Sequence, residues 1–215
     1  MLGYNCPMEI LRKVYYASYG LNMDKKRFLT YLEGGTPPGA LRTYAGSRDT
    51  SPPMEDSFMK VPGYELYFAS QSSAWTGGIA FIRKRVSSYI FTRQYLITTE
   101  QLSDVIAQEN GKEAPDPAYD IDMAKLAGGD TYEFPEGTYS RLVLLYKRDG
   151  VPVFTCTSAM RKSPTGPKDA YIATIARGLA QGSVDKTEIL SYLSSAVNGT
   201  VSPAHLAVLL AGLTR

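Results

Sequence analysis

Apolar and polar residues alternate through the middle of the chain, in a pattern that predicts a strand-rich region between helices. Runs rich in β-branched and aromatic residues predict strands, because such side chains pack well on a pleated surface. The predicted strands cover residues 14–18, 41–44, 64–69, 74–82, 89–97, 141–146 and 151–158. Asp149-Gly150 is a two-residue turn signal, so we expect the last two strands to form a hairpin.

Apolar residues at helical spacing predict helices around this region. The predicted helices cover residues 24–33, 100–108, 168–181 and 185–196, and a last helix follows Ser202-Pro203. Because strands dominate the middle with few crossovers, the pattern predicts an α+β fold: a small mixed, barrel-like β-sheet with flanking helices. We expect residues 1–182 to form this domain and residues 183–215 to form a C-terminal helical extension packed on it.

The composition is that of an ordinary globular protein, with 215 residues, 44% hydrophobic content and a formal net charge of +2. A charge this small gives no strong attraction to nucleic acid or a membrane surface. No apolar run reaches the ~18 residues that span a bilayer. Cys6 and Cys156 lack CxxC spacing, so they predict neither a zinc site nor a disulfide framework, and we expect free thiols in a reducing cytoplasm.

Histidine is scarce in this chain, which contains only His205. That residue follows Ser202-Pro203 at the start of an apolar helix, and we interpret it as a first-turn or packing residue. Histidine-based catalysis and histidine-rich metal sites are therefore disfavoured, and acid–base chemistry falls to Asp, Glu, Lys or Tyr. Sixteen tyrosines make phenol hydroxyls plentiful as groups that position a substrate.

The segment from Val14 to Met23 has the pattern of a strand, a tight loop and the start of a helix. Such a junction directs backbone N–H groups and the positive end of a helix dipole at one point, which suits a carboxylate. Gly20 fits there because glycine permits a positive φ and a close approach. Gly77-Gly78 inside a predicted strand indicates a bulge or a close backbone contact.

Three segments of the chain, in order, resemble motifs of the γ-glutamyl cyclotransferase superfamily. The first is Tyr19-Gly20-Leu21-Asn22-Met23, which resembles the YGSNM loop. The second is Trp75-Thr76-Gly77-Gly78-Ile79-Ala80, which resembles the WxGGIA strand. Gln108-Glu109, at the end of a predicted helix, resembles the Gln-Glu-Gly of the family. The resemblance, over residues 13–181, implies a small mixed barrel that needs no cofactor and cyclises a γ-glutamyl group to 5-oxoproline, releasing an amine or amino acid.

The resemblance also implies roles for individual residues. Glu109 would be the catalytic general acid/base, which requires a carboxyl pKa raised above its ordinary value, as apolar burial can do. Backbone N–H groups of Gly20, Leu21 and Asn22 would hold the substrate carboxylate or the developing oxyanion.

The remaining implied substrate contacts are the phenols of Tyr19 and Tyr171. The implied partner is a small γ-glutamyl amine or peptide, with neither nucleic acid nor a membrane involved. Nothing in the sequence demands a dimer, so a monomer is expected and a dimer stays open.

Leu21 and Asn110 depart from the family motifs, which have serine and glycine at these positions. We expect Asn110 or Gly111 in a left-handed position at the helix end. Leu21 leaves two alternatives open: a catalytically silent member of the same fold that binds a small acidic metabolite or a protein partner, or a related γ-glutamyl acyl-transfer enzyme. Plain structural interpretations also stand, namely an ordinary strand–helix turn for the loop and a solvated helix-end carboxylate for Glu109.

Overall fold

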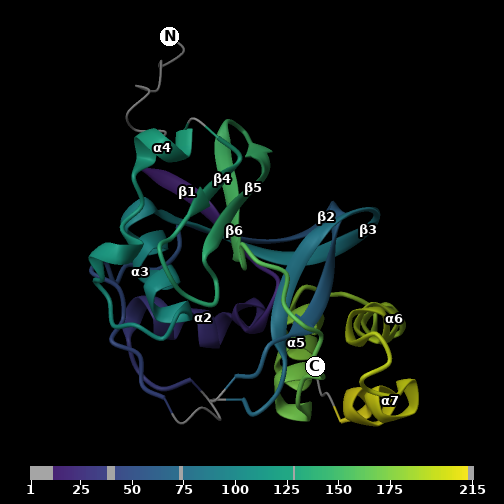
Figure 1. Cartoon of the computed structure of the whole chain (residues 1–215). Coiled ribbons are helices and arrows are strands. Elements are labelled where there is room, and N and C mark those ends of the chain that lie inside the picture. The colour runs from purple at the N-terminus through teal and green to yellow at the C-terminus, as the bar shows by residue number, and fades with distance from the viewer. Residues whose placement is uncertain (1–11, 38–41, 73–74, 128, 213–215) are drawn as a thin grey trace. The chain divides into compact units, whose positions relative to one another are not determined.

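The computed structural model describes residues 12–37, 42–72, 75–127 and 129–212 (Figure 1). The strands are β1 (Lys13–Ser18), β2 (Glu55–Ala69), β3 (Ile79–Thr98), β4 (Thr131–Glu133), β5 (Arg141–Arg148) and β6 (Val151–Thr157). The α-helices are α2 (Lys25–Glu33), α3 (Thr99–Glu109), α4 (Met123–Ala127), α5 (Asp169–Gln181), α6 (Lys186–Val197) and α7 (Pro203–Ala211). Two single 3₁₀ turns, η1 (Leu21–Met23) and η2 (Pro117–Tyr119), complete the elements of these ranges.

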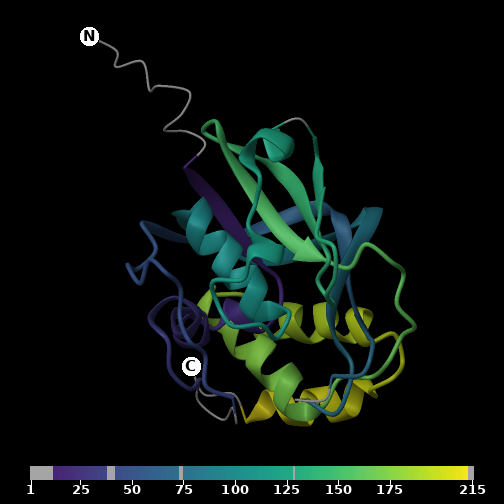
Figure 2. The same ribbon diagram turned by 60° about the vertical axis from the view of Figure 1, so that its left-hand side comes forward.

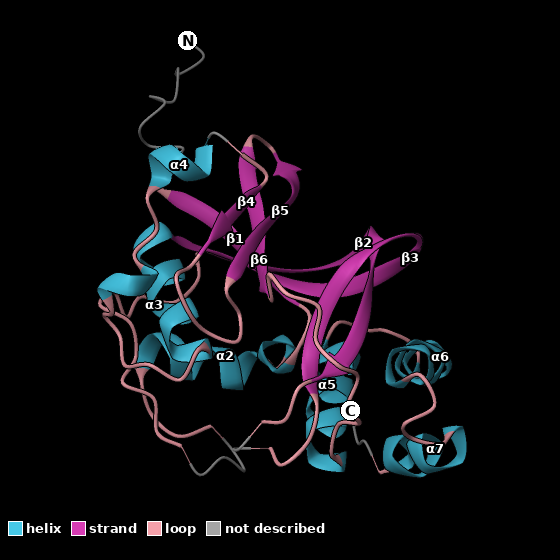
Figure 3. Ribbon diagram, viewed as in Figure 1, coloured by secondary structure: helices cyan, strands magenta, loops and turns pink. Residues whose placement is uncertain are grey.

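Among the described residues, six strands form one mixed sheet in the order β2-β3-β1-β6-β5-β4 (Figure 3). β1 runs parallel to β6, with Tyr16 opposite Phe154, whereas β6, β5 and β4 are successive antiparallel neighbours. The α+β class and the mixed sheet are therefore confirmed. The sheet is open, with β2 and β4 as its edge strands, rather than closed into a barrel.

Two strands predicted at residues 74–82 and 89–97 form a single strand, β3, which begins at Ile79. β3 continues through residues 83–88, between the two predicted strands, and this stretch begins with the exposed basic cluster Arg83-Lys84-Arg85. Arg83 and Arg85 both form ion pairs with Glu65 on the neighbouring strand β2. These cross-strand pairs support a charged, solvated stretch that has few apolar side chains of its own.

The predicted strand at residues 41–44 is not formed in its described part. Leu41 lies outside the described residues, as does Cys6. Tyr44 makes an isolated antiparallel bridge with Gly35, just after α2. The bridge and a pair of tilted rings, Tyr31 and Tyr44 at 4.4 Å, hold this segment to the helix without a strand.

Residue contacts divide the chain into two compact units. The first comprises Met1–Ala17, Leu29–Ser57 and Gln94–Ala159, and the second Ser18–Phe28, Phe58–Arg93 and Met160–Arg215. The predicted boundary after residue 182 stays a prediction. The helices on both sides of it, α5 before and α6 and α7 after, belong to the second unit.

The core of the first unit forms around β1 and β6. Tyr15 and Ala17 pack with Val153 on one face of the sheet. Both faces of β1 are covered, since its consecutive residues from Val14 to Ser18 are all buried. The apolar face of α3 is fully buried and includes Leu102, Val105 and Ile106.

Helix α5 is the centre of the second unit. It packs on η1, where Gly178 allows a close approach, because a Cβ at that position would lie 2.5 Å from the Cβ of Met23. Helices α6 and α7 contact α5 and each other, and they lie together in both ribbon views (Figures 1 and 2). The buried stripe of α5 includes the predicted residues Tyr171, Ile172, Ile175 and Leu179.

Gly77 and Gly78 precede β3 and make the close backbone contact that their sequence indicates. The N–H of Gly78 donates to the carbonyl of Gly166 at 2.9 Å. A Cβ at position 78 would lie 2.0 Å from the carbonyl oxygen of Thr165. This distance is far inside van der Waals contact, so only glycine fits without a backbone shift.

Gly78→Ala should lower the free energy of unfolding by more than about 2 kcal/mol, because the added methyl group must displace the Thr165 backbone. Urea unfolding followed by circular dichroism measures this change. Gly129→Ala is the control, since its added Cβ would meet nothing closer than 3.8 Å. Equal unfolding free energies for the two variants would contradict the close contact.

Candidate active site

Glu109 is the last residue of α3, and its side chain is half-buried. The hydroxyl of Tyr16, on β1, donates a hydrogen bond to Oε1 of Glu109 at 3.1 Å. The partial negative charge at a helix C-terminus disfavours a carboxylate there. The phenol therefore stabilises a charge that the helix itself opposes, which distinguishes Glu109 from a solvated helix-end carboxylate.

Asn110 follows Glu109 and caps α3 with φ −89°, so the left-handed position belongs to Gly111, at φ +79°. The expectation of a left-handed conformation is thus wrong for Asn110 and correct for Gly111. The Asn110 side chain instead pairs with the backbone of Tyr139: its Nδ2 donates to the carbonyl at 3.2 Å, and its Oδ1 accepts from the N–H at 2.8 Å. This reciprocal pair fixes the segment around Tyr139 to the end of α3.

The Gln108 side chain also holds the C-terminal end of α3. Its amide is 2% exposed and has three backbone partners in the first unit. Nε2 donates to the carbonyls of Tyr31 at 2.9 Å and Asp104 at 3.1 Å, and Oε1 accepts from the N–H of Gly46 at 3.3 Å. A buried amide satisfied in this way is costly to displace. Gln108 therefore positions the residue that follows it, Glu109.

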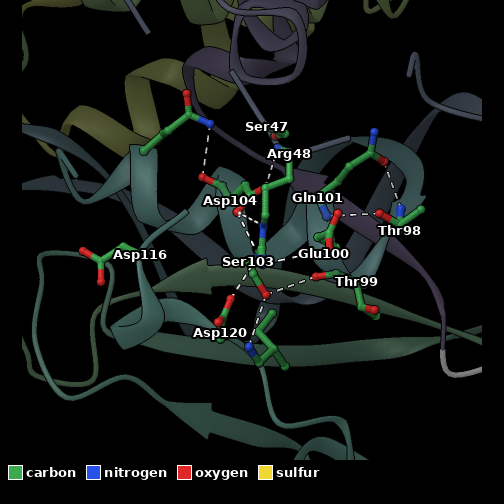
Figure 4. A network of polar contacts seen from close by, with 12 residues as sticks. Ser47, Arg48, Thr98, Thr99, Glu100, Gln101, Ser103, Asp104, Asp116 and Asp120 are labelled. Carbon is green, nitrogen blue, oxygen red and sulfur yellow. Dashed lines mark hydrogen bonds and ion pairs between the residues drawn. The ribbon is translucent and has the colours of Figure 1, made fainter. Parts of the chain in front are cut away.

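A polar network centred on Arg48 holds α3 along its length (Figure 4). Asp104, which is 1% exposed, accepts from Nε of Arg48 at 3.0 Å and from its backbone N–H at 2.8 Å. Nη2 of Arg48 also donates to Asp120 at 3.0 Å, so the guanidinium lies between two carboxylates. Hydrogen bonding to Asp104 raises the pKa of Arg48 above its ordinary value.

The start of α3 is fixed by a cap at Thr98. Thr98 accepts from the N–H of Gln101 at 3.0 Å, and the Gln101 side chain accepts from the N–H of Thr98 at 3.0 Å, which is a capping box. Gln101 also donates to the carbonyls of Asp49 and Ser51 at 3.0 and 2.9 Å. The helix that carries Glu109 is thus anchored at both ends by buried side-chain amides.

Cys156, on β6, lies beside the hydroxyl that holds Glu109. It comes two residues after Phe154, the partner of Tyr16, so Tyr16 and Cys156 share one face of the sheet. A side-chain hydrogen bond joins the thiol to Tyr16. Burial raises the pKa of Cys156 well above its ordinary value, and the charge of Glu109 adds to the effect, so the thiol stays protonated.

The loop at Tyr19–Met23 forms the 3₁₀ turn η1 rather than running directly into a long helix. Gly20 has φ −116°, so the expected positive φ is wrong, and a Cβ there would meet Ala80 at an ordinary 3.6 Å. Asp24 precedes α2, and its carboxylate accepts from the N–H groups of Lys26 and Arg27. The start of α2 is therefore filled by its own side chain, which leaves the turn at residues 20–22 as the candidate anion contact.

Tyr171 is buried in the second unit and brings two of the motifs together. Its hydroxyl accepts a hydrogen bond from the N–H of Ala80 at 3.0 Å and lies 4.0 Å from the position of a Cβ on Gly20. Its ring packs edge-on against Trp75, with centroids 5.2 Å apart. The hydroxyl thus bonds the second motif and lies near the first.

The predicted site residues fall into two groups, one in each unit. Tyr19, Gly20, Leu21, Asn22 and Tyr171 belong to the second unit, and Glu109 belongs to the first. Their action in one site stays a prediction. Sequence reasoning did not single out Tyr16 and Cys156 as neighbours of Glu109. No spacing rule finds them, because only the parallel register of β1 and β6 places them together.

Comparison with solved structures identifies the fold. A γ-glutamyl cyclotransferase matches with a TM-score of 0.52 and 14% identity, over 93% of this chain and 99% of that one. The chain has the γ-glutamyl cyclotransferase-like fold. An uncharacterised protein from Homo sapiens matches with a TM-score of 0.51 and 13% identity, over 92% of this chain and 98% of that one. YkqA from Bacillus subtilis also matches, with a TM-score of 0.51 and 17% identity, over 87% of this chain and 55% of that one.

Sequence comparison gives a different kind of relative. No family model matches the chain. Histone deacetylase 5 from Arabidopsis thaliana is 36% identical over 204 residues, which are 86% of this chain and 31% of that protein. The chain therefore spans about a third of the length of this curated relative, so it resembles one part of a larger protein.

Three further features of the described residues bear on the site. No helix in these ranges is long and apolar enough to cross a membrane. The same ranges contain no group of three or more His, Cys, Asp or Glu side chains arranged to hold a metal ion. A hollow of about 220 Å³ in the second unit has a wall that includes Glu65, Tyr89 and Tyr192, and none of the predicted site residues line it.

Arg48→Met should lower the free energy of unfolding by about 2 kcal/mol, because it leaves the buried Asp104 carboxylate without its cation. The figure lies below that of a fully buried pair because Arg48 is itself 32% exposed. Urea unfolding measures the loss. Arg141→Met, which removes an exposed pair with Glu133, is the control and should cost less than ~1 kcal/mol. A loss no greater than the control's would contradict the anchoring role.

Proposed function

We propose that this chain is a γ-glutamyl cyclotransferase-like enzyme that converts a γ-glutamyl group to 5-oxoproline and releases an amine or amino acid. The observation that carries the proposal is the Glu109 carboxylate, half-buried at a helix end and held by the Tyr16 hydroxyl. The fold supports it, as do the three motifs in their family order. β1, which carries Tyr16, continues directly into the loop that begins at Tyr19.

The proposed reaction is intramolecular and needs few groups. The α-amine of the substrate attacks its own γ-carbonyl, a C–N bond forms to close the five-membered ring, and the original amide C–N bond breaks. Glu109 takes the proton that the α-nitrogen loses and returns it to the leaving nitrogen. Because nucleophile and electrophile belong to one molecule, holding the substrate in a folded conformation supplies much of the rate.

The turn at residues 20–22 is proposed to bind the anionic part of this substrate. In η1 the donors of the two intrahelical bonds are Met23 and Asp24, so the N–H groups of Gly20, Leu21 and Asn22 precede them at its N-terminal end. Such donors suit a carboxylate or a developing oxyanion. The phenols of Tyr19 and Tyr171 are proposed to complete the substrate contacts.

The proposed partner is a small γ-glutamyl molecule, and the proposed setting is a monomer in the cytoplasm. The formal charge of +2 supports a small-molecule partner over nucleic acid. The activity in the name of the Arabidopsis thaliana relative is not proposed for this chain, because the match leaves more than two thirds of that protein unaligned.

Glu109→Gln should reduce 5-oxoproline release by about 100-fold or more, because an amide cannot carry the proton. The assay is chromatographic detection of 5-oxoproline from a panel of γ-glutamyl amines and dipeptides. Glu100→Gln is the matched control: the same substitution in the first turn of the same helix, on a side chain that is 52% exposed. Wild-type rates in Glu109→Gln would overturn the assignment.

A catalytically silent member of the same fold is the second candidate, and Leu21 favours it because the family motif has serine there. If the turn binds through backbone N–H groups, Leu21→Ser should change kcat by far less than the ~100-fold typical of a lost oxyanion donor. The measurements are turnover and calorimetric binding of 5-oxoproline. Binding without turnover in the wild type, with turnover gained in Leu21→Ser, would establish the silent member.

A further inference from the structure

We propose that Tyr16 is a positioning residue of this reaction: its hydroxyl holds one oxygen of the Glu109 carboxylate, and the Cys156 thiol is its second partner. The inference rests on the proposed function, which it deepens. Tyr16 is 2% exposed, so its ring is fixed in the core and only its hydroxyl reaches the carboxylate. None of the three family motifs includes Tyr16 or Cys156.

The parallel pairing of β1 with β6 determines this geometry. Tyr16 lies opposite Phe154, and Cys156 lies two residues further along β6 on the same face. Tyr15 points to the other face, where its hydroxyl donates to Glu55 at 2.7 Å. Two consecutive phenols on one strand thus bind two different glutamates, and only Tyr16 is bound to Glu109.

The electrostatics of the helix end explain why a phenol is suited to this position. The last carbonyls of α3 carry partial negative charge, which opposes a carboxylate at residue 109. A phenol is neutral at pH 7, so its O–H stabilises the carboxylate without forming an ion pair that would quench its basicity. The Tyr16 hydroxyl donates to Glu109, and a side-chain hydrogen bond also joins Tyr16 to the Cys156 thiol.

The Tyr16 hydrogen bond orients the Glu109 carboxylate, because Oε1 accepts from the fixed phenol. The carboxylate held in this way then moves the proton from the substrate ammonium to the leaving nitrogen. Tyr16 from β1 and Cys156 from β6 are among the titratable side chains near Glu109. Burial raises the pKa of the Cys156 thiol well above its ordinary value, so the thiol stays protonated near neutral pH.

Tyr16→Phe tests the inference, with Tyr15→Phe as the matched control on the same strand. A hydrogen bond to a carboxylate favours its charged form, so its loss raises the pKa of Glu109. The base must be deprotonated, so the acid limb of the kcat/KM profile should move up by about one pH unit. We expect kcat to fall about 10-fold with KM nearly unchanged. The reason is that the Tyr16 hydroxyl holds the carboxylate that transfers the proton and does not bind the substrate.

A readout without turnover separates this inference from the proposed function. NMR titration of ¹³C-labelled glutamate, with the Glu109 resonance assigned by Glu109→Gln, should show a raised midpoint in Tyr16→Phe but not in Tyr15→Phe. Equal midpoints in the two variants would overturn the positioning role whatever the activity. A raised midpoint in a protein that releases no 5-oxoproline would support the role of Tyr16 and overturn the proposed reaction.

Cys156→Ala is the second variant, since it disturbs the same hydroxyl and keeps the aromatic ring in place. It should raise the Glu109 midpoint by less than Tyr16→Phe does, because the thiol acts through the phenol. If the Glu109 midpoint in Cys156→Ala equalled that in Tyr15→Phe, the thiol would have no part in holding the Tyr16 hydroxyl. Unfolding temperatures of all three variants within a few degrees of the wild type would show that the comparison concerns folded proteins.

Discussion

The parallel pairing of β1 with β6 is the constraint on which the proposed chemistry of the first unit depends. β1 lies between β3 and β6 in the sheet, and its residues from Val14 to Ser18 are buried. The pairing places Tyr16 opposite Phe154 and brings Cys156 to the same face. A slip of one residue would turn Tyr16 to the opposite face and place Tyr15 beside Cys156. Register therefore decides which phenol serves Glu109.

Helix α3 brings the carboxylate to that face, and polar side chains fix the helix. Gln101 at its start and Gln108 near its end are each 1–2% exposed, and each bonds backbone groups of other segments. Asp104 between them takes the Arg48 guanidinium. Buried polar groups with several partners are costly to rearrange, and they specify one arrangement more strictly than apolar contacts do. Such anchoring suits a residue whose oxygen must be placed within a fraction of an ångström.

The two departures from the family motifs, Asn110 and Leu21, affect the structure to different degrees. Asn110 replaces a glycine, and its side chain compensates by pairing with the Tyr139 backbone beside the end of α3. Leu21 replaces a serine in a turn whose backbone donors are unchanged by the side chain. The fold tolerates both changes, and the solved structures that share it are only 13–17% identical to this chain. Function is therefore decided by the site and not by the fold.

The sequence alone determined the elements and the motifs of this protein. Strand and helix periodicity and the cap at Thr98 follow from local rules, since each depends on residues close together in the chain. The Gly77-Gly78 pair indicated a close backbone contact, but its partner at Thr165 and Gly166 lies far away in the chain. Only the tertiary structure decided that β3 is one strand, that Gly20 has a negative φ, and that Tyr16 and Cys156 lie beside Glu109. These features depend on strand register and long-range hydrogen bonds, for which the chain carries no local pattern.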